Sequence, residues 1–207
     1  RLLCVQEDVA DKIIEMIVGA GQELKLGDPR DVSVHLGPVI DQPAKDRLDE
    51  HVDAMAGQGR VIWRGEVPAL PGHFIAPAVI RLDSVADLDK EHFGPVLHVV
   101  RYHSRDLDAV IDAIDATGYG LTLGLHTRID GMVERVTKRL GTGNIYVNRN
   151  MIGAVVGVQP FGGSGLSGTG PKAGGPHYLP RFATEQTVTI NTAAAGGNAA
   201  LIAAGDD

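Results

Sequence analysis

The chain has 207 residues, of which 43% are hydrophobic and 22% are charged, and these values exclude disorder for most of its length. Its 19 Lys and Arg face 26 Asp and Glu, and the resulting formal charge of -7 disfavours binding to the phosphate backbone of nucleic acids. No apolar stretch approaches the ~20 residues of a membrane-spanning helix and no secretion signal is evident, so we expect a cytoplasmic protein without a membrane span.

The first quarter of the chain predicts one strand and two amphipathic helices. The apolar run over residues 1–6 has no preceding turn or cap, so we expect the chain to begin inside a strand and to be a fragment. Apolar residues at helical spacing predict a helix over 8–20, with Asp8 as its N-cap and Gly21 among the residues that end it. A second helix is predicted over 41–56, with a proline in its first turn.

From residue 61 onwards, short strands and helices alternate. The predicted strands cover residues 61–64, 78–82, 96–101, 121–127 and 144–148, and the predicted helices cover residues 106–116 and 130–140. This alternation is typical of an α/β layered domain with a substantially parallel sheet.

The sequence between residues 151 and 181 shows neither the helical nor the strand period. Eleven of the chain's 27 glycines fall between Gly153 and Gly197, which indicates irregular backbone. A long stretch of this kind inside a compact domain is usually functional or disordered. After it, Thr187–Asn191 alternates like a half-exposed strand and is predicted to pair across an interface.

Residues 163–168 match G-x-G-x-x-G, the fingerprint of dinucleotide-binding loops. That loop needs a strand before it and a helix directly after it, whose N-terminus holds the pyrophosphate. Pro171 and the Gly-Gly-Pro run that ends at Pro176 preclude such a helix. We therefore interpret these residues as a turn and not as a cofactor fingerprint.

Cysteine and histidine give no independent sign of catalysis or metal binding. The single cysteine, Cys4, lies in an apolar strand, where burial raises a thiol pKa, so a structural role is favoured over a nucleophile. The eight histidines show no H-x-x-x-H or H-E-x-x-H spacing, so no metal site is predicted and they are interpreted as surface or packing residues.

Two segments combine residue types that suit binding. Glu91-His-Phe-Gly-Pro95 places a carboxylate that could bind a sugar diol before a strand, although a plain turn with a solvated Glu is the commoner reading. The segment from Gly153 to Gly163 reads either as an apolar loop or as an anchor. In the anchor, backbone N–H groups bind an anion and Phe161 packs on an aliphatic chain.

Several separate stretches together resemble the aldehyde dehydrogenase superfamily. In chain order they are Leu26-Gly-Asp-Pro29, Leu36-Gly-Pro-Val-Ile40, Glu91-His-Phe-Gly-Pro95, Tyr119-Gly-Leu121, Gly143-Asn-Ile-Tyr-Val-Asn148 and Pro160-Phe-Gly-Gly163. More narrowly, residues 148–161 and 168–175 resemble the glutamate-semialdehyde (pyrroline-5-carboxylate) dehydrogenase domain of the bifunctional proline-utilisation enzymes. The resemblance covers residues 1–198 and implies the C-terminal part of a layered αβα catalytic domain.

The resemblance assigns roles to five residues. Glu91 would hydrogen-bond the nicotinamide-side ribose of NAD, and Phe93 would lie beside the nicotinamide end of the site. Gly153 and Ala154 would offer backbone N–H groups to the α-carboxylate of the substrate, while Phe161 would pack against its methylene chain.

The implied parent reaction is the oxidation of L-glutamate 5-semialdehyde to glutamate. Its steps would be cysteine attack to a thiohemiacetal, hydride transfer to NAD and hydrolysis of the thioester. Cys4 does not match the nucleophile's position, and the family's catalytic cysteine would lie upstream of Arg1. We therefore assign no catalytic residue and expect the isolated chain to be inactive. FAD would bind only to a proline dehydrogenase domain elsewhere in the same parent.

The resemblance also sets the expected organisation. Residues 1–183 would belong to the catalytic domain, 184–198 to an oligomerisation strand and tail of a homo-oligomer, and 199–207 to a flexible tail. Two alternatives stay open at this point. The parent is a related dehydrogenase for another semialdehyde, or the chain is a truncated, non-catalytic interaction module.

Overall fold

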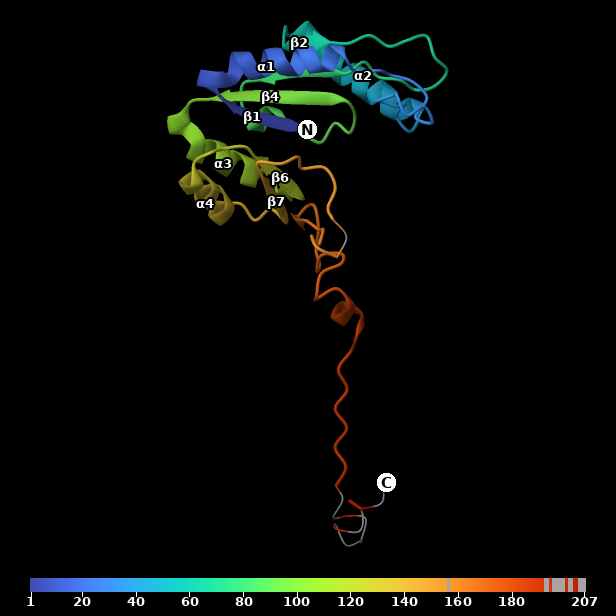
Figure 1. Ribbon diagram of the computed structural model, residues 1–207, viewed down its shortest axis with the longest axis vertical. Helices are drawn as coiled ribbons and strands as arrows, with labels where there is room; N and C mark the ends of the chain where they lie inside the picture. The colour runs from blue at the N-terminus through green and yellow to red at the C-terminus, as the bar shows by residue number, and fades with distance from the viewer. Residues whose placement is uncertain (156, 192–193, 195–199, 201–202, 205–207) are drawn as a thin grey trace. The chain divides into compact units, whose positions relative to one another are not determined.

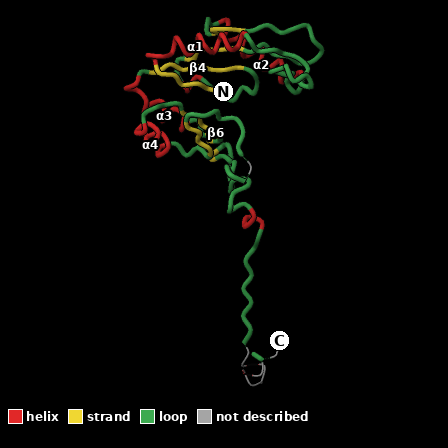
Figure 2. Tube along the Cα trace, in the orientation of Figure 1, coloured by secondary structure: helices red, strands yellow, loops and turns green. Residues whose placement is uncertain are grey.

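The chain forms two compact units, which are described separately. The computed structural model describes residues 1–155, 157–191, 194, 200 and 203–204. The first unit contains residues 1–151 and 163–169, and the second contains residues 152–162 and 170–207. Helices α1 to α4, labelled in Figure 2, and strands β1 to β8 all belong to the first unit by their residue ranges.

A four-stranded sheet forms the centre of the first unit. In spatial order its strands are β1 (Leu2–Gln6), β4 (Val96–Tyr102), β3 (Ala78–Leu82) and β2 (Val61–Arg64). The pairs β1–β4 and β3–β4 are parallel, while β2 runs antiparallel to β3 at one edge. The substantially parallel sheet expected from the alternation of strands and helices is therefore confirmed.

Helices cover both faces of this sheet, which confirms the layered αβα prediction. Helix α1 (Glu7–Gln22) lies along β4 (Figure 1) and buries Ala10 against Val79 and Val99. Helix α2 (Gln42–Gly57) covers the other face with Leu48 and Val52, which are almost completely buried. Consecutive side chains of a strand point to opposite faces, so one apolar strand supplies both layers of the core.

The capping of α2 follows the sequence prediction, whereas that of α1 does not. The Asp41 carboxylate accepts a hydrogen bond of 2.8 Å from the N–H of Ala44, as an N-cap does. Helix α1 begins one residue before Asp8, and the N-cap is Gln6, so the predicted cap is wrong. Gly21 lies inside α1 and does not end the helix. Because glycine has no Cβ, the last turn of the helix can approach the ring of Trp63 closely.

Gly21 and Gly19 form a matched pair for a test of this packing. A Cβ at position 21 would meet Trp63 ring carbons at 2.8 and 2.9 Å, whereas a Cβ at position 19 has nothing within 4 Å. We expect Gly21→Ala to destabilise the full-length protein by about 1–2 kcal/mol, because overpacking outweighs the gain in helix propensity. Gly19→Ala should stabilise it by up to about 1 kcal/mol. Thermal unfolding that gives both changes the same sign would contradict this packing.

A second α/β layer completes the first unit. Its elements are η1 (Val85–Asp87), η2 (Ser104–Asp106), α3 (Leu107–Ala116), β5 (Tyr119–Gly120), β6 (Thr122–Leu125), α4 (Asp130–Arg139), β7 (Asn144–Val147) and β8 (Ser164–Gly165). Strands β6 and β7 pair in parallel. Helices α3 and α4 pack through Leu107, Ile111 and Val136. The predicted helices and strands are confirmed, with β6 shorter than expected.

The G-x-G-x-x-G segment is a tight turn, as interpreted from the sequence. Strand β8 lies within it and pairs with β5. A Cβ at Gly163 would meet Ser167 at 2.6 Å, and one at Gly168 would meet Gly163 at 2.5 Å, so the turn itself requires both glycines. The next helical element is the short η3 (Leu179–Phe182), which does not follow the segment directly.

Within its described residues up to 191, the second unit is irregular apart from η3 and one isolated bridge between Phe161 and Ala173. The predicted strand Thr187–Asn191 is not assigned as a strand here, and its pairing across an interface stays a prediction. Residues 192–193, 195–199, 201–202 and 205–207 of the expected tails lie outside the described residues. The expected boundaries after residues 183 and 198 likewise stay predictions. None of the described helices has the length and hydropathy needed to cross a bilayer.

Candidate functional site

Glu91 and Phe93 lie on the loop that leads into β4 and point away from the core. Phe93 is 74% exposed, and the Glu91 side chain is 52% exposed. Between them, His92 is only 7% exposed and turns inward. This alternation places a carboxylate and an aromatic ring on the surface, on either side of the buried His92 in the sequence.

Arg1 connects the two exposed side chains. Its guanidinium forms an ion pair with the Glu91 carboxylate and lies 4.0 Å from the centre of the Phe93 ring. Strands β1 and β4 are parallel neighbours, so the residue just before β1 meets the loop just before β4. Sequence reasoning missed this contact because it depends on strand order.

Gly94 fixes the same loop against α2. A Cβ at this position would meet the Leu48 side chain at 2.5 Å, so only glycine allows this close approach. The carbonyl of Pro95 then accepts a hydrogen bond of 3.0 Å from the N–H of Ala78. The loop is therefore attached both to the helix layer and to the neighbouring strand.

Three histidines from different elements meet beneath this loop. The rings of His51 on α2 and His92 are stacked, with centroids 3.4 Å apart. The Nε2 atoms of His51 and His98 are 2.8 Å apart, and His98 on β4 is completely buried. Desolvation is the main cause that lowers the pKa of His51 and of His98 to about 4.

The histidine cluster is a packing feature, as interpreted from the sequence, although its assembly was not predicted. The three residues are far apart in the chain and show no spacing signal. No group of His, Cys, Asp or Glu side chains within the described ranges is suited to hold a metal ion. The observed contacts of the cluster are the ring stacking of His51 on His92 and the contact of His51 with His98.

The second unit contains the predicted anchor loop. Gly153 has a φ of +72°, a conformation that favours glycine. The N–H of Val155 donates to Gln159 Oε1 at 3.1 Å, and the N–H of Gln159 donates to the Val155 carbonyl at 2.8 Å. Among the described residues, the N–H groups of Gly153 and Ala154 have no hydrogen-bond acceptor. Two adjacent donors thus remain available for an anion.

Phe161 follows this loop and is held by its backbone. Its N–H and C=O exchange hydrogen bonds of 3.0 and 2.9 Å with Ala173. The ring is 37% exposed and can contact an apolar chain. The structure thus brings Glu91 and Phe93 together in the first unit, and holds Phe161 with the anchor loop in the second.

Cys4 is suited to packing and not to nucleophilic attack. The side chain is half-buried in β1 and packs against the core beneath α2. Burial raises the pKa of its thiol to about 11, so very little thiolate exists at neutral pH. The structural role expected from the sequence is confirmed.

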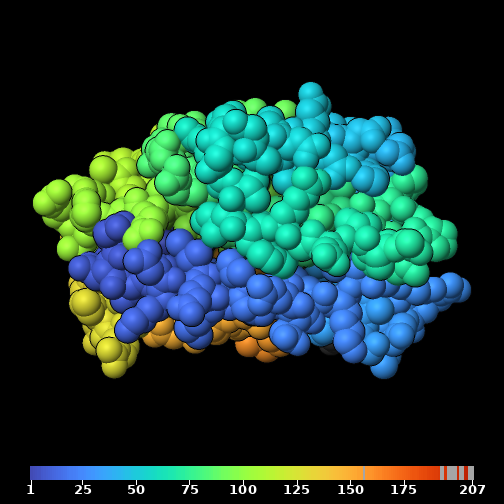
Figure 3. Space-filling view, turned by 90° about the horizontal axis from the view of Figure 1, so that it is seen from above, coloured from blue at the N-terminus to red at the C-terminus, as the bar shows by residue number. Residues whose placement is uncertain are grey.

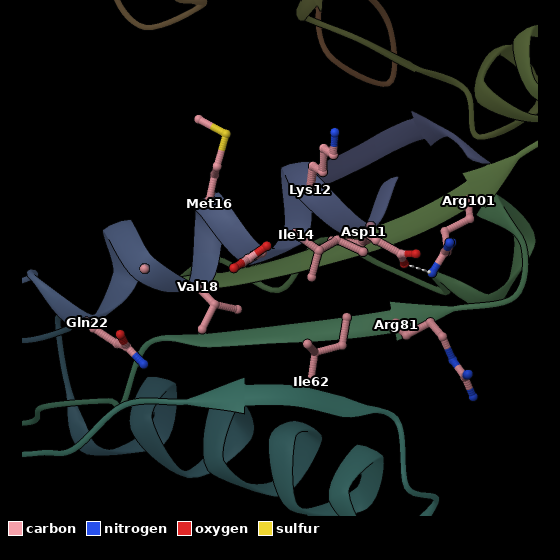
Figure 4. A pocket seen from close by; sticks show the side chains of 12 residues that line it. Asp11, Lys12, Ile14, Met16, Val18, Gln22, Ile62, Arg81 and Arg101 are labelled. Carbon is pink, nitrogen blue, oxygen red and sulfur yellow. Dashed lines mark ion pairs between the residues drawn. The ribbon is translucent and has the colours of Figure 1, made fainter. Parts of the chain in front are cut away.

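An open groove lies between α1 and the sheet, and neither Glu91 nor Phe93, the predicted site residues of the first unit, lines it. Figure 3 shows this side of the first unit, with α1 in blue and the segment around β2 in cyan. The groove has a volume of about 1120 Å³, and Ile14, Val18 and Ile62 contribute apolar lining (Figure 4). At one end Arg101 pairs with Asp11 at 2.9 Å. No sequence prediction concerned this surface.

Comparison with known proteins identifies the class to which these features belong. The aldehyde dehydrogenase family profile matches residues 1–188, and the chain belongs to that family. It is 52% identical over 189 residues to the bifunctional protein PutA of Klebsiella aerogenes. This alignment covers 88% of this chain and 14% of that protein. It is also 38% identical over 192 residues to a 1-pyrroline-5-carboxylate dehydrogenase of Geobacillus sp. (strain WCH70), covering 89% of this chain and 36% of that protein.

A solved structure gives the same result for the fold. A mutant of Bradyrhizobium japonicum Proline Utilization A matches with a TM-score of 0.88 and 64% sequence identity. The match covers 94% of this chain and 20% of that chain. The expected resemblance to the aldehyde dehydrogenases and to proline-utilisation enzymes is confirmed, and the chain spans about one fifth or less of these bifunctional relatives.

Proposed function

We propose that this chain is part of an NAD-dependent L-glutamate 5-semialdehyde dehydrogenase. The observation that carries the proposal is the pair of N–H groups at Gly153 and Ala154, which have no acceptor in the described part of the chain, followed by the exposed ring of Phe161. Relatives named 1-pyrroline-5-carboxylate dehydrogenase and PutA support this substrate. The 1-pyrroline-5-carboxylate of that name is the cyclic imine that glutamate 5-semialdehyde forms by losing water.

The substrate would bind by its carboxylate and its methylene chain. Adjacent backbone N–H groups form an anion-binding concavity, and these donors need no reorganisation because nothing in the described chain occupies them. The α-carboxylate would accept both hydrogen bonds, and Phe161 would pack on the CH₂ groups. An aldehyde that lacks the carboxylate would lose both hydrogen bonds.

The first unit has residues that fit a nicotinamide dinucleotide, which the family uses as NAD or NADP. A carboxylate can accept hydrogen bonds from a ribose diol, and the Glu91 carboxylate is exposed enough to do so. The exposed Phe93 ring offers a flat apolar surface beside it. We propose NAD as the cofactor, which would accept hydride from the substrate. When NAD binds, the Glu91 carboxylate would give up its ion pair with Arg1 and accept hydrogen bonds from the ribose instead.

The nucleophile would come from another part of the parent, because Cys4 is the chain's single cysteine and has a raised pKa. We also propose that the parent is cytoplasmic and carries a proline dehydrogenase domain with FAD, as its PutA relatives suggest. It would assemble as a homo-oligomer through Thr187–Asn191. On this proposal the isolated chain is inactive.

The test compares three aldehydes in the full-length parent enzyme. Initial rates of NADH formation would be measured with glutamate 5-semialdehyde, succinate semialdehyde and butanal. We expect kcat/KM to be highest for glutamate semialdehyde, and at least about 10-fold lower for butanal, because hydrogen bonds to a charged group contribute about 1.5–3 kcal/mol. A preference for succinate semialdehyde or for butanal would reject the proposed substrate.

A further inference from the structure

Beneath the exposed pair Glu91 and Phe93, two hydrogen bonds fix which ring nitrogens of His51 and His98 carry a hydrogen. His98 Nδ1 lies 3.3 Å from the carbonyl oxygen of Arg1, which can only accept a hydrogen bond. His98 Nδ1 therefore carries the hydrogen, and its Nε2 is an acceptor. The Nε2 of His51, 2.8 Å away, must then be the donor.

This arrangement requires a neutral His98. A proton on His98 Nε2 would point two N–H groups at each other across the 2.8 Å contact. Burial lowers the pKa of His98 to about 4, which keeps the ring neutral at physiological pH. The hydrogen bond between α2 and β4 is therefore maintained at physiological pH.

His51 connects the buried His98 to the loop of residues 91–94. Its ring stacks on His92, which is buried and has Glu91 and Phe93 on either side in the sequence. One helical turn earlier on α2, Leu48 packs against Gly94. Helix α2 thus contacts the loop at two successive positions and holds its exposed residues outward.

We propose that His51 is a positioning residue for the cofactor, which holds the loop of residues 91–94 so that Glu91 and Phe93 face the dinucleotide. The inference rests on the proposed function only in taking Glu91 and Phe93 as cofactor contacts. It concerns the binding of NAD and not the identity of the aldehyde.

The test uses the full-length parent with His51→Leu, His51→Gln and Val52→Ala. Leucine removes both the stacking and the hydrogen bond, whereas the glutamine amide can still donate to His98. Val52 is fully buried in the core on the same helix, so its truncation controls for loss of stability alone.

For His51→Leu we expect the Kd of NAD, titrated without aldehyde, to rise about 3- to 10-fold, with the aldehyde KM changing less than about 2-fold. Hydrogen exchange of the peptide over residues 89–95 should accelerate in the enzyme without cofactor. His51→Gln should recover at least half of the lost affinity. Val52→Ala should lower Tm and leave the Kd of NAD unchanged.

Three results would overturn the inference: an unchanged Kd of NAD in His51→Leu, equal losses for NAD and aldehyde, or the same NAD loss in Val52→Ala. If His51→Leu does not fold, Gly94→Ala pushes the same loop off Leu48 and should produce the same NAD-specific loss. Normal NAD binding in that variant would also overturn the inference. A wild-type enzyme inactive on glutamate semialdehyde would instead reject the proposed function.

Discussion

Replacing Ala154 with proline in the full-length enzyme is expected to lower kcat/KM for glutamate 5-semialdehyde about 10- to 100-fold, mainly through KM. Proline removes one N–H donor of the anchor loop, and a hydrogen bond to a charged group contributes about 1.5–3 kcal/mol. That N–H has no acceptor among the described residues, so the substitution breaks no hydrogen bond within the described part of the chain. Steady-state rates with varied aldehyde measure the effect.

Ala154→Ser is the matched control, because serine keeps the backbone N–H and adds only a hydroxyl. It should stay within about 3-fold of the wild type, and the Kd of NAD should be the same in both variants. If Ala154→Pro keeps full activity on glutamate semialdehyde, the α-carboxylate is bound elsewhere. A dehydrogenase for another semialdehyde would then be the better interpretation.

Glu91→Gln is expected to raise the KM for NAD about 10- to 100-fold and to leave the KM for the aldehyde nearly unchanged. The amide lacks the negative charge that strengthens hydrogen bonds from a ribose diol, and it has one acceptor oxygen where the carboxylate has two. The measurement is the initial rate at saturating aldehyde over a range of NAD concentrations.

Lys90→Ala is a suitable control for this change, because Lys90 is the exposed neighbour of Glu91 and its side chain is 63% exposed. It should leave both KM values close to those of the wild type. An unaltered KM for NAD in Glu91→Gln would remove Glu91 from the cofactor site. It would also leave the ion pair with Arg1 as the structural role of that carboxylate.

Much of the local structure was predictable because it depends on short-range patterns. The apolar spacing in 41–56 and the cap at Asp41 predict α2 to within one residue at each end. The end of α1 was not predictable, because glycine normally ends helices and only the tertiary contact with Trp63 explains Gly21 inside one. Periodicity does not determine strand order, so the strand over residues 61–64 was predicted but its antiparallel pairing at the sheet edge was not.

The candidate site was predictable in part for the same reason. The glycine-rich composition predicts irregular backbone around Gly153, and the structure adds the role of Gln159 in closing that loop. The contact of Arg1 with Glu91 and the meeting of three histidines were not predictable, because they join elements that only the fold brings together. The roles of Glu91, Phe93, Gly153, Ala154 and Phe161 themselves remain proposals for experiment.

The central claim is that the anchor loop binds the α-carboxylate of a five-carbon amino acid semialdehyde. A crystal structure of the full-length enzyme with NAD and glutamate, the reaction product, tests it most directly. The account predicts the α-carboxylate within ~2.7–3.2 Å of the backbone nitrogens of Gly153 and Ala154, with Phe161 against the methylene groups. A carboxylate bound by other residues, with both N–H groups facing solvent, would contradict it.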